Sequence, residues 1–226
     1  MTGPGGAARS AAAACGRKAL WRAVFALTGG LRVAGVGALP PGPCVIVANH
    51  RSHADTAALI AALPAGRRPA VAAAADYWFS GGARPRLGRL LCGAFPVRRG
   101  GGGSEDLAAA ARLLAAGRDV IVFPEGSRSR DGRTAGFHRG AARLAVAAGV
   151  PLVPVGIGGT GTLLPPRGSG GRPRRGAVTV SIGTAICVLE QAERLISADR
   201  AGPDAATDAT AKARAQVLAL VGVTSN

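Results

Sequence analysis

The chain has few acidic residues and almost no lysine. Of its 226 residues, 12 are Asp or Glu and 28 are Lys or Arg, which gives a formal net charge of +16. Only Lys18 and Lys212 are lysines, so nearly all of the positive charge comes from arginine. Arginine is well suited to bidentate contacts with phosphate. The charge balance therefore indicates a polyanionic partner, either an anionic lipid surface or a nucleic acid.

Several other sequence signatures are also missing. There is no helix-turn-helix, zinc-finger or aromatic RNA-binding pattern, so an anionic membrane surface is the expected partner and nucleic acid is not. The four cysteines are widely spaced and form no disulfide or zinc pattern, which favours a reducing compartment. Arginine or proline interrupts every apolar run before about 18 residues, so no transmembrane helix is expected.

The length and composition fit a single domain. A chain of this length, with 48% hydrophobic residues, can bury a full core, although aromatic residues make up only 4%. We expect a disordered N-terminus over residues 1–17, an amphipathic helix within 18–40, and the main domain over 41–226.

The expected helix begins at Lys18 and has one apolar side. Its apolar stripe lies broadly opposite three basic residues: Leu20, Val24, Leu27 and Leu31 against Lys18, Arg22 and Arg32. This pattern fits a helix lying in a membrane interface, and it fits equally a helix packed on the protein's own sheet.

Strand-like and helix-like segments alternate along the rest of the chain. Strands are expected over 44–48, 70–75, 94–97, 120–123, 152–157 and 177–188, and helices over 54–63, 105–116, 139–148 and 206–221. This alternation predicts an α/β fold, with a mixed, largely parallel sheet flanked by helices. A Gly-x-Gly-x-x-Gly match over 156–161 is soon followed by Pro165 and Pro166, so it does not indicate nucleotide binding.

A histidine and an aspartate follow the first buried strand. His50 lies at the end of that strand, and Asp55 falls in the first turn of the expected helix. A carboxylate there can fix one imidazole nitrogen and leave the other free to act as a general base. Two alternatives remain open: a loop histidine beside an ordinary helix-start acid, or a metal site of His50, His53 and Asp55 completed by Cys44 or His138.

A second polar loop follows the strand over 120–123. Gly126 permits close approach of the backbone, and Ser127 and Arg128 offer a hydroxyl and a guanidinium suited to phosphate. Glu125 would accept a substrate hydroxyl or pair with an arginine; the alternative is a solvated turn. Because parallel strands bind ligands at their carboxyl ends, both loops are expected to meet at one site.

These segments resemble the 1-acyl-sn-glycerol-3-phosphate acyltransferase family of glycerolipid acyltransferases. The family's four ordered motifs are matched by Asn49-His50-x4-Asp55, Gly93 to Arg99, Phe123 to Ser129, and Val150 to Val155. In the second motif Arg98 stands where the family often has an acid, so Arg99 is the expected functional arginine. His138 stands where the family usually has a lysine. The resemblance covers about residues 41–160.

The resemblance implies transfer of a fatty acyl group from acyl-CoA or acyl carrier protein to a lysophospholipid, without a cofactor or a metal. His50 would be the base and Asp55 its partner. Substrate-binding positions would be Asn49, Arg99, Glu125, Gly126, Ser127, Arg128 and Pro154. Tyr77, Trp78 and Phe79 would line an acyl pocket or fill the core. The expected location is the cytoplasmic face of the cell membrane, as a peripheral protein.

Three other functions are compatible with the same residues. The first is a related acyltransferase that uses another lysophospholipid or glycerol-3-phosphate. The second is a basic lipid- or nucleic-acid-binding protein without turnover, and the third is a metal-dependent hydrolase.

Overall fold

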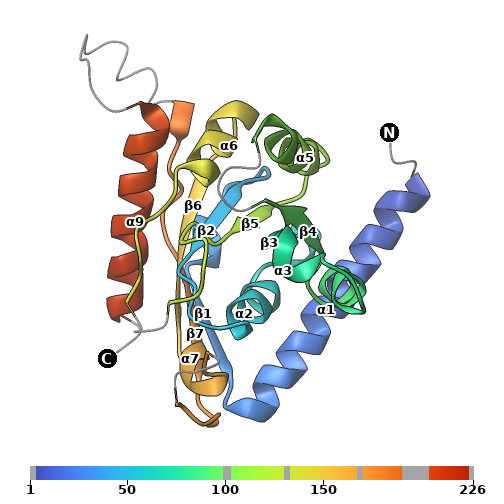
Figure 1. Cartoon of the computed structure of the whole chain (residues 1–226), viewed down its shortest axis with the longest axis vertical. Helices are drawn as coiled ribbons and strands as arrows, with labels where there is room; N and C mark the ends of the chain where they lie inside the picture. Colours follow the sequence, from blue (N-terminus) through green and yellow to red (C-terminus); the bar gives the residue numbers. More distant parts are fainter. Residues whose placement is uncertain (1–3, 99–102, 130–132, 167–169, 190–203, 224–226) are drawn as a thin grey trace.

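A mixed seven-stranded sheet forms the centre of the molecule (Figure 1). The computed structural model describes residues 4–98, 103–129, 133–166, 170–189 and 204–223. The strand order is β1-β7-β6-β2-β5-β3-β4, and every neighbouring pair is parallel except β6 and β7. The predicted α/β fold is confirmed. The strands are β1 (Leu31–Ala34), β2 (Val45–Ala48), β3 (Ala70–Ala74), β4 (Ala94–Val97), β5 (Val120–Val122), β6 (Leu152–Gly158) and β7 (Val178–Ile182).

Helices cover both faces of the sheet (Figure 1). The longer ones are α1 (Pro4–Thr28), α2 (Ala54–Ala62), α5 (Gly103–Ala115), α6 (Gly140–Ala148) and α9 (Ala205–Val223). The single-turn elements are α3 (Ala75–Trp78), α4 (Arg84–Leu87), α7 (Thr160–Leu163), η1 (Val36–Ala38), η2 (Ala65–Arg67) and η3 (Gly88–Cys92). Helices α1 and α2 pack on one face, and α5, α6 and α9 pack on the other.

Strand β2 lies in the middle of the sheet and is buried on both faces. Ile46 packs in the core beneath α1 and α2, whereas Val45 and Val47 pack against α5, α6 and α9. Burial on both faces explains why this strand reads as a continuous apolar run. Val47 is in register with Val122 of β5 and with Pro154 of β6. The loops that follow these three strands therefore leave the sheet at one edge.

The N-terminal region differs from the sequence prediction. Residues 4–28 form helix α1, so the expected disorder over 1–17 is wrong for residues 4–17. Alanine dominates this segment and is the strongest helix former, which outweighs the glycines at its start. The helix expected within 18–40 ends at Thr28 and is followed by β1 and η1. Phe25 anchors α1 in the core, while Leu20 and Leu27 of the predicted apolar stripe are exposed.

The predicted strand over 177–188 is shorter in the structure. Strand β7 ends at Ile182, and Ile186 makes a separate antiparallel bridge to Leu152. Between them, Gly183 lies against Pro154: its amide donates to the Pro154 carbonyl at 2.8 Å, and a Cβ at position 183 would be 3.2 Å from Pro154 Cγ. This close approach bends the chain out of the strand.

A buried ion pair ties the amino-terminal end of the sheet together. Arg67 donates through Nε and Nη2 to the two carboxylate oxygens of Asp119, at 2.7 and 2.8 Å. The same carboxylate accepts the backbone amide of Cys44 at 3.1 Å. Burial lowers the pKa of Arg67, but the hydrogen bonds and charge of Asp119, together with the contribution of Cys44, leave it raised overall. Burial also raises the pKa of the Cys44 thiol, to about 12. This pair links the residues before β2, β3 and β5.

Candidate active site

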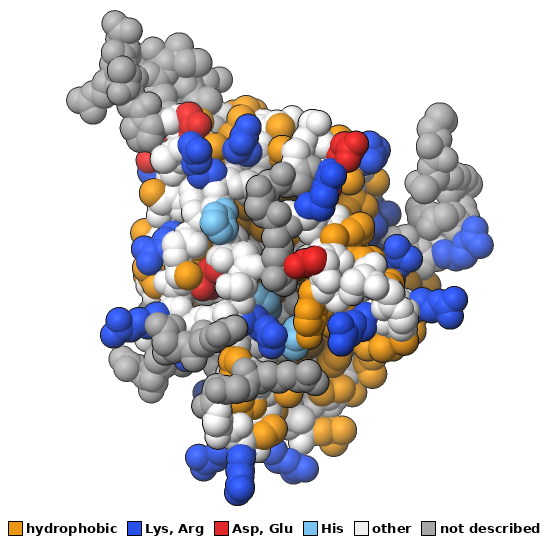
Figure 2. Space-filling model, viewed as in Figure 1, with side chains coloured by type: hydrophobic (Ala, Val, Ile, Leu, Met, Phe, Trp, Pro, Cys, Tyr) orange, Lys and Arg blue, Asp and Glu red, His pale blue; other side chains and the backbone are white. Residues whose placement is uncertain are grey.

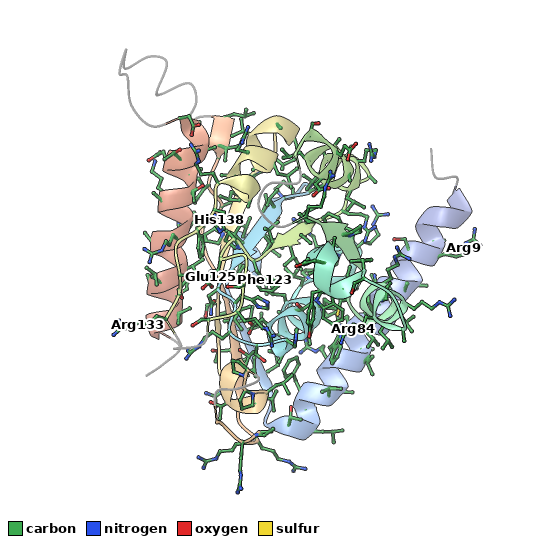
Figure 3. All side chains as sticks on the ribbon, in the orientation of Figure 1. Arg9, Arg84, Phe123, Glu125, Arg133 and His138 are labelled. Atoms are coloured by element: carbon green, nitrogen blue, oxygen red, sulfur yellow. The ribbon has the colours of Figure 1, made fainter. Side chains whose placement is uncertain are left out.

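The loops after β2 and β5 meet at the carboxyl end of the sheet, as the sequence predicted. Phe123 and Glu125 lie side by side near the centre of Figure 3, with His138 above them. Two backbone hydrogen bonds join the segments: Ser129 donates to the His50 carbonyl at 2.8 Å, and His138 donates to the Pro124 carbonyl at 2.9 Å. Residues that are far apart in the sequence therefore form one site.

His50 and Asp55 are in direct contact. The distance between His50 Nδ1 and Asp55 Oδ2 is 2.9 Å, and the Asp55 side chain is fully buried. The same oxygen accepts the backbone amides of Arg51 and Ser52, at 2.7 and 2.8 Å. Because this oxygen acts only as an acceptor, Nδ1 of His50 carries the hydrogen of the pair. In the neutral imidazole this assignment leaves Nε2 without a proton and able to accept one.

An aromatic ring supports the imidazole from one side. The rings of His50 and Phe123 are stacked, with centroids 4.1 Å apart and planes 19° apart. The sequence reasoning missed this role. The signal available was an aromatic residue at the end of β5, in the segment expected to lie beside the histidine. Together, Asp55 and Phe123 fix both the position and the plane of the imidazole.

Glu125 joins two segments of backbone. One carboxylate oxygen accepts the His50 amide at 2.7 Å, and the other accepts the Ala135 amide at 2.8 Å. Burial raises the pKa of this carboxyl, and the two amide hydrogen bonds act in the opposite direction. In the described part of the chain no arginine pairs with it, so the arginine partner considered from the sequence is not found. Its direct effect is to position the loop that carries His50.

Two predicted substrate-binding residues, Asn49 and Pro154, are buried and contact other parts of the fold. Asn49 donates from Nδ2 to the Ile157 carbonyl at 2.9 Å and accepts the Ile157 amide at 2.8 Å, and it is completely buried. Pro154 lies buried within β6, away from the carboxyl end of the strand. Asn49 therefore fixes the end of β2 to β6, and Pro154 packs against Gly183. Their side-chain contacts are structural.

The other predicted binding residues lie along the loop after Glu125. Gly126 has a positive φ of 72°, and a Cβ there would be 3.4 Å from the His138 ring, so glycine is favoured at this turn. Ser127 is exposed and Arg128 is half-buried. Arg99 lies outside the described residues. Its neighbour Arg98 contacts Glu105 and Asp106 in the first turn of α5, at 2.7 and 3.3 Å.

His53 belongs to an aromatic cluster beside the site. Its ring stacks on Tyr77 and meets Trp78 edge-on, with centroid distances of 6.0 and 5.6 Å. The cluster residues Tyr77, Trp78 and Phe79 are half-buried, so they do not form part of the main core. In the described residues, no group of three or more His, Cys, Asp or Glu side chains could hold a metal ion. His50 therefore contacts Asp55, while the ring contacts of His53 are with Tyr77 and Trp78.

The arrangement has the features of an acyl-transfer site: a fixed imidazole, a buried carboxylate partner and a polar loop at the carboxyl end of a sheet. The family model described as Acyltransferase matches residues 30–158, which is more than half of the chain. The chain therefore belongs to the acyltransferase family.

Similar proteins bear more specific names. A 1-acyl-sn-glycerol-3-phosphate acyltransferase of Chlamydomonas reinhardtii is 43% identical over 88 residues, which cover 39% of this chain and 26% of that protein. The chloroplastic enzyme of the same name from Brassica napus is 35% identical over 144 residues, which cover 62% of this chain and 40% of that protein. The human alpha enzyme of that name is 39% identical over 132 residues, which cover 56% of this chain and 45% of that protein. The matches span less than half of these relatives' lengths.

A solved structure shares the fold. The crystal structure of the 1-acyl-sn-glycerophosphate acyltransferase PlsC from Thermotoga maritima superposes with a TM-score of 0.72, at 22% identity, over 94% of this chain and 79% of that one. At this identity the match supports the fold alone, over the 94% of the chain that it covers.

Proposed function

We propose that the protein is an O-acyltransferase that moves a fatty acyl group from acyl-CoA, or from acyl carrier protein, to the free hydroxyl of 1-acyl-sn-glycerol-3-phosphate, giving phosphatidic acid. The observation that carries the proposal is the contact between His50 and the buried Asp55 at the carboxyl end of the sheet. Membership of the acyltransferase family and the names of the similar proteins support the choice of reaction and acceptor.

His50 acts as the base in this reaction. Its Nε2 takes the proton of the acceptor hydroxyl while that oxygen attacks the carbonyl carbon of the thioester. Asp55 stabilises the imidazolium that forms, because its charge is held next to Nδ1. The carbon–sulfur bond then breaks, and the imidazolium returns the proton to the departing thiolate. The products are an ester and a free thiol.

The polar loop after β5 would bind the acceptor phosphate. Arg128 offers a half-buried guanidinium, and Ser127 adds an exposed hydroxyl beside it. Arg99 is proposed as a second phosphate ligand on the basis of its place in the family motif. Glu125 contributes indirectly, because it holds the His50 amide. We assign it, together with Asn49, as a positioning residue.

The half-buried aromatic cluster would contact the acyl chain. Tyr77, Trp78 and Phe79 follow the carboxyl end of β3, and Tyr77 and Trp78 contact His53, which lies three residues beyond His50. Partly exposed aromatic rings beside a reactive centre offer an apolar surface to a hydrocarbon chain. This favours the acyl-pocket hypothesis over the core hypothesis for these residues.

The protein would work at a membrane surface, where lysophospholipids reside. Four leucines on α1, α4 and η3 are largely exposed: Leu20 at 44%, Leu27 at 74%, Leu87 at 48% and Leu90 at 68%. Figure 2 shows hydrophobic side chains interspersed with basic ones on the side that carries α1. No helix among the described residues combines the length and apolarity needed to cross a membrane. We propose peripheral binding to the anionic cytoplasmic face.

Acceptor-dependent thiol release tests the proposed reaction. The purified chain is mixed with a fatty acyl-CoA, with and without 1-acyl-sn-glycerol-3-phosphate, and free thiol is measured. We expect release that requires the acceptor, is abolished in His50→Ala, and is unchanged in Asp208→Asn, a surface control on α9. Addition of a chelator should leave it unchanged.

Each alternative predicts a different result. Release that survives His50→Ala would contradict the assignment of the base. Release that occurs only with glycerol-3-phosphate or another lysophospholipid would leave the assignment of His50 as the base intact. It would contradict the assignment of 1-acyl-sn-glycerol-3-phosphate as the acceptor. Loss of release with a chelator would favour a metal-dependent hydrolase.

A further inference from the structure

A surface cavity of about 270 Å³ lies between helix α1 and turn η3. Three of its lining residues are arginines, Arg17, Arg89 and Arg118, and none of the described lining residues is acidic. The cavity also includes Ala94, the first residue of β4, while Arg118 lies just before β5. It is therefore at the amino-terminal end of the sheet, opposite the edge that carries His50.

Within the described part of the chain, no carboxylate compensates the positive charges around this cavity. Among the described residues, none of the three arginines forms an ion pair with Asp or Glu. Arg118 donates from Nε to the Arg68 carbonyl at 3.0 Å, and Arg89 lies over the Phe79 ring at 5.4 Å. Burial lowers the pKa of Arg17, and it lowers that of Arg118 together with repulsion from Arg17 and Arg68. Arg17 and Arg118 are therefore held near each other and partly desolvated.

The fold treats Arg67, another partly buried arginine, in a different way. Arg67 is paired bidentately with Asp119. A comparable acid would neutralise the cavity if the arginines there served only to stabilise the fold. Instead, the structure leaves space for an anion in front of them.

A glycine brings one of the guanidinium groups into place. Gly93 has a φ of 64°, and a Cβ at this position would be 3.1 Å from the Pro69 carbonyl oxygen and 3.5 Å from Arg17 Nη2. The absence of a side chain at 93 lets the Arg17 guanidinium lie close to the backbone at the start of β4. The cavity wall is thus shaped by the backbone as well as by charge.

We propose that this cavity binds the phosphate group of an anionic ligand between Arg17, Arg89 and Arg118. Three guanidinium groups can supply several charge-assisted hydrogen bonds, and the Ser10 hydroxyl lines the same cavity. Leu90 is 68% exposed and adjoins Arg89, so a phospholipid headgroup with its chains beside η3 fits the surroundings, and a free phosphate fits the cavity alone. The site is separate from Arg128 and does not depend on acyl transfer.

The experiment uses the full chain and two probes. Inorganic phosphate is titrated by calorimetry, and vesicles of phosphatidylcholine, alone or mixed equally with phosphatidylglycerol, are used in sedimentation. The test variant Arg17→Gln/Arg89→Gln is compared with Arg86→Gln/Arg112→Gln, which removes the same charge from exposed positions outside the cavity. We expect the test variant to bind on the order of tenfold more weakly, and the control by less than about twofold.

A third variant tests the cavity without removing an arginine. Ala13 is exposed on α1 and lines the cavity, so Ala13→Glu places a carboxylate beside the guanidinium groups. We expect this variant to lose phosphate binding and to unfold at a higher temperature than wild type, because it relieves the repulsion. An effect on vesicles alone identifies a lipid headgroup, and an effect on inorganic phosphate alone identifies free phosphate. Equal losses in the test and control pairs, or no binding of either probe by wild type, overturn the proposal.

Discussion

The two ends of the central sheet hold their buried acids in opposite ways. At the amino-terminal end, Asp119 faces the guanidinium of Arg67, and its charge is neutralised by an ion pair. At the carboxyl end, Asp55 and Glu125 are held by backbone amides, and Asp55 also by an imidazole. Amide donors fix a carboxylate without cancelling its charge. The acid at the amino-terminal end is therefore paired with a cation, whereas Asp55, the proposed partner of the base, faces the His50 imidazole.

Asp55→Asn should have the largest effect. The amide keeps the size of the side chain but loses the charge that stabilises an imidazolium, so kcat should fall on the order of 10² to 10⁴. Steady-state thiol release with saturating acceptor measures this, and circular dichroism checks the fold. A variant with normal kcat would show that the charge held by amides at this end has no part in the chemistry.

Asp119→Asn should affect stability rather than activity. The substitution leaves the Arg67 guanidinium largely buried without its partner, which typically costs about 3–5 kcal/mol of unfolding free energy. Urea unfolding measures the loss, and activity per folded molecule should stay at the wild-type value. The double variant Arg67→Met/Asp119→Leu removes both charges and should recover most of the stability. If the single and double variants are equally unstable, the ion pair is not the cause.

Glu125→Gln should change how stability depends on pH. Because burial raises the pKa of Glu125 in the folded protein, the unfolded chain releases this proton at a lower pH than the folded protein does. The contribution of Glu125 to stability is therefore full below the unfolded pKa of about 4.3 and is lost as pH rises through the folded pKa. Urea midpoints of wild type, relative to those of the variant, should decrease over this range and then level off. Parallel pH curves would contradict a buried, titrating carboxyl.

Arg98→Ala should have the smallest effect. Its ion pairs with Glu105 and Asp106 lie at the surface, where water competes with them, and Arg98 is 54% exposed. We expect no resolvable change in the urea midpoint. A large decrease in the urea midpoint would mean that solvent exposure does not explain the difference in stability contribution between these ion pairs and the one between Arg67 and Asp119.

The sequence predicted the parts of the molecule that depend on local pattern. The buried run before Asn49 and the run over 120–123 became β2 and β5. The turn from β2 into α2 brings His50 next to Asp55. Strand β1 was missed because it has only four residues, two of which belong to the amphipathic pattern of the helix expected within 18–40. Its pairing with β7 joins residues nearly 150 positions apart, such as Leu31 and Val178. Such long-range partners leave no local pattern to read.

The functions of individual polar side chains were harder to predict. Asn49 belongs to the family motif, but its two hydrogen-bond partners are on Ile157, 108 residues away. Glu125 was expected to contact substrate or arginine, because a sequence does not reveal which backbone amides will face a carboxylate. Spacing identified the two loops of the site, and tertiary packing decided which atoms within them meet.

The stacking of Phe123 on His50 also has a spectroscopic consequence. With one ring face covered and Nδ1 hydrogen-bonded to a buried oxygen, the imidazole cannot turn over without breaking both contacts. Its two nitrogens are thus permanently inequivalent. In a ¹⁵N-labelled sample, the Nδ1 proton should exchange slowly enough with water to give a resolved, downfield-shifted resonance, while Nε2, which carries no hydrogen in the neutral ring, gives none.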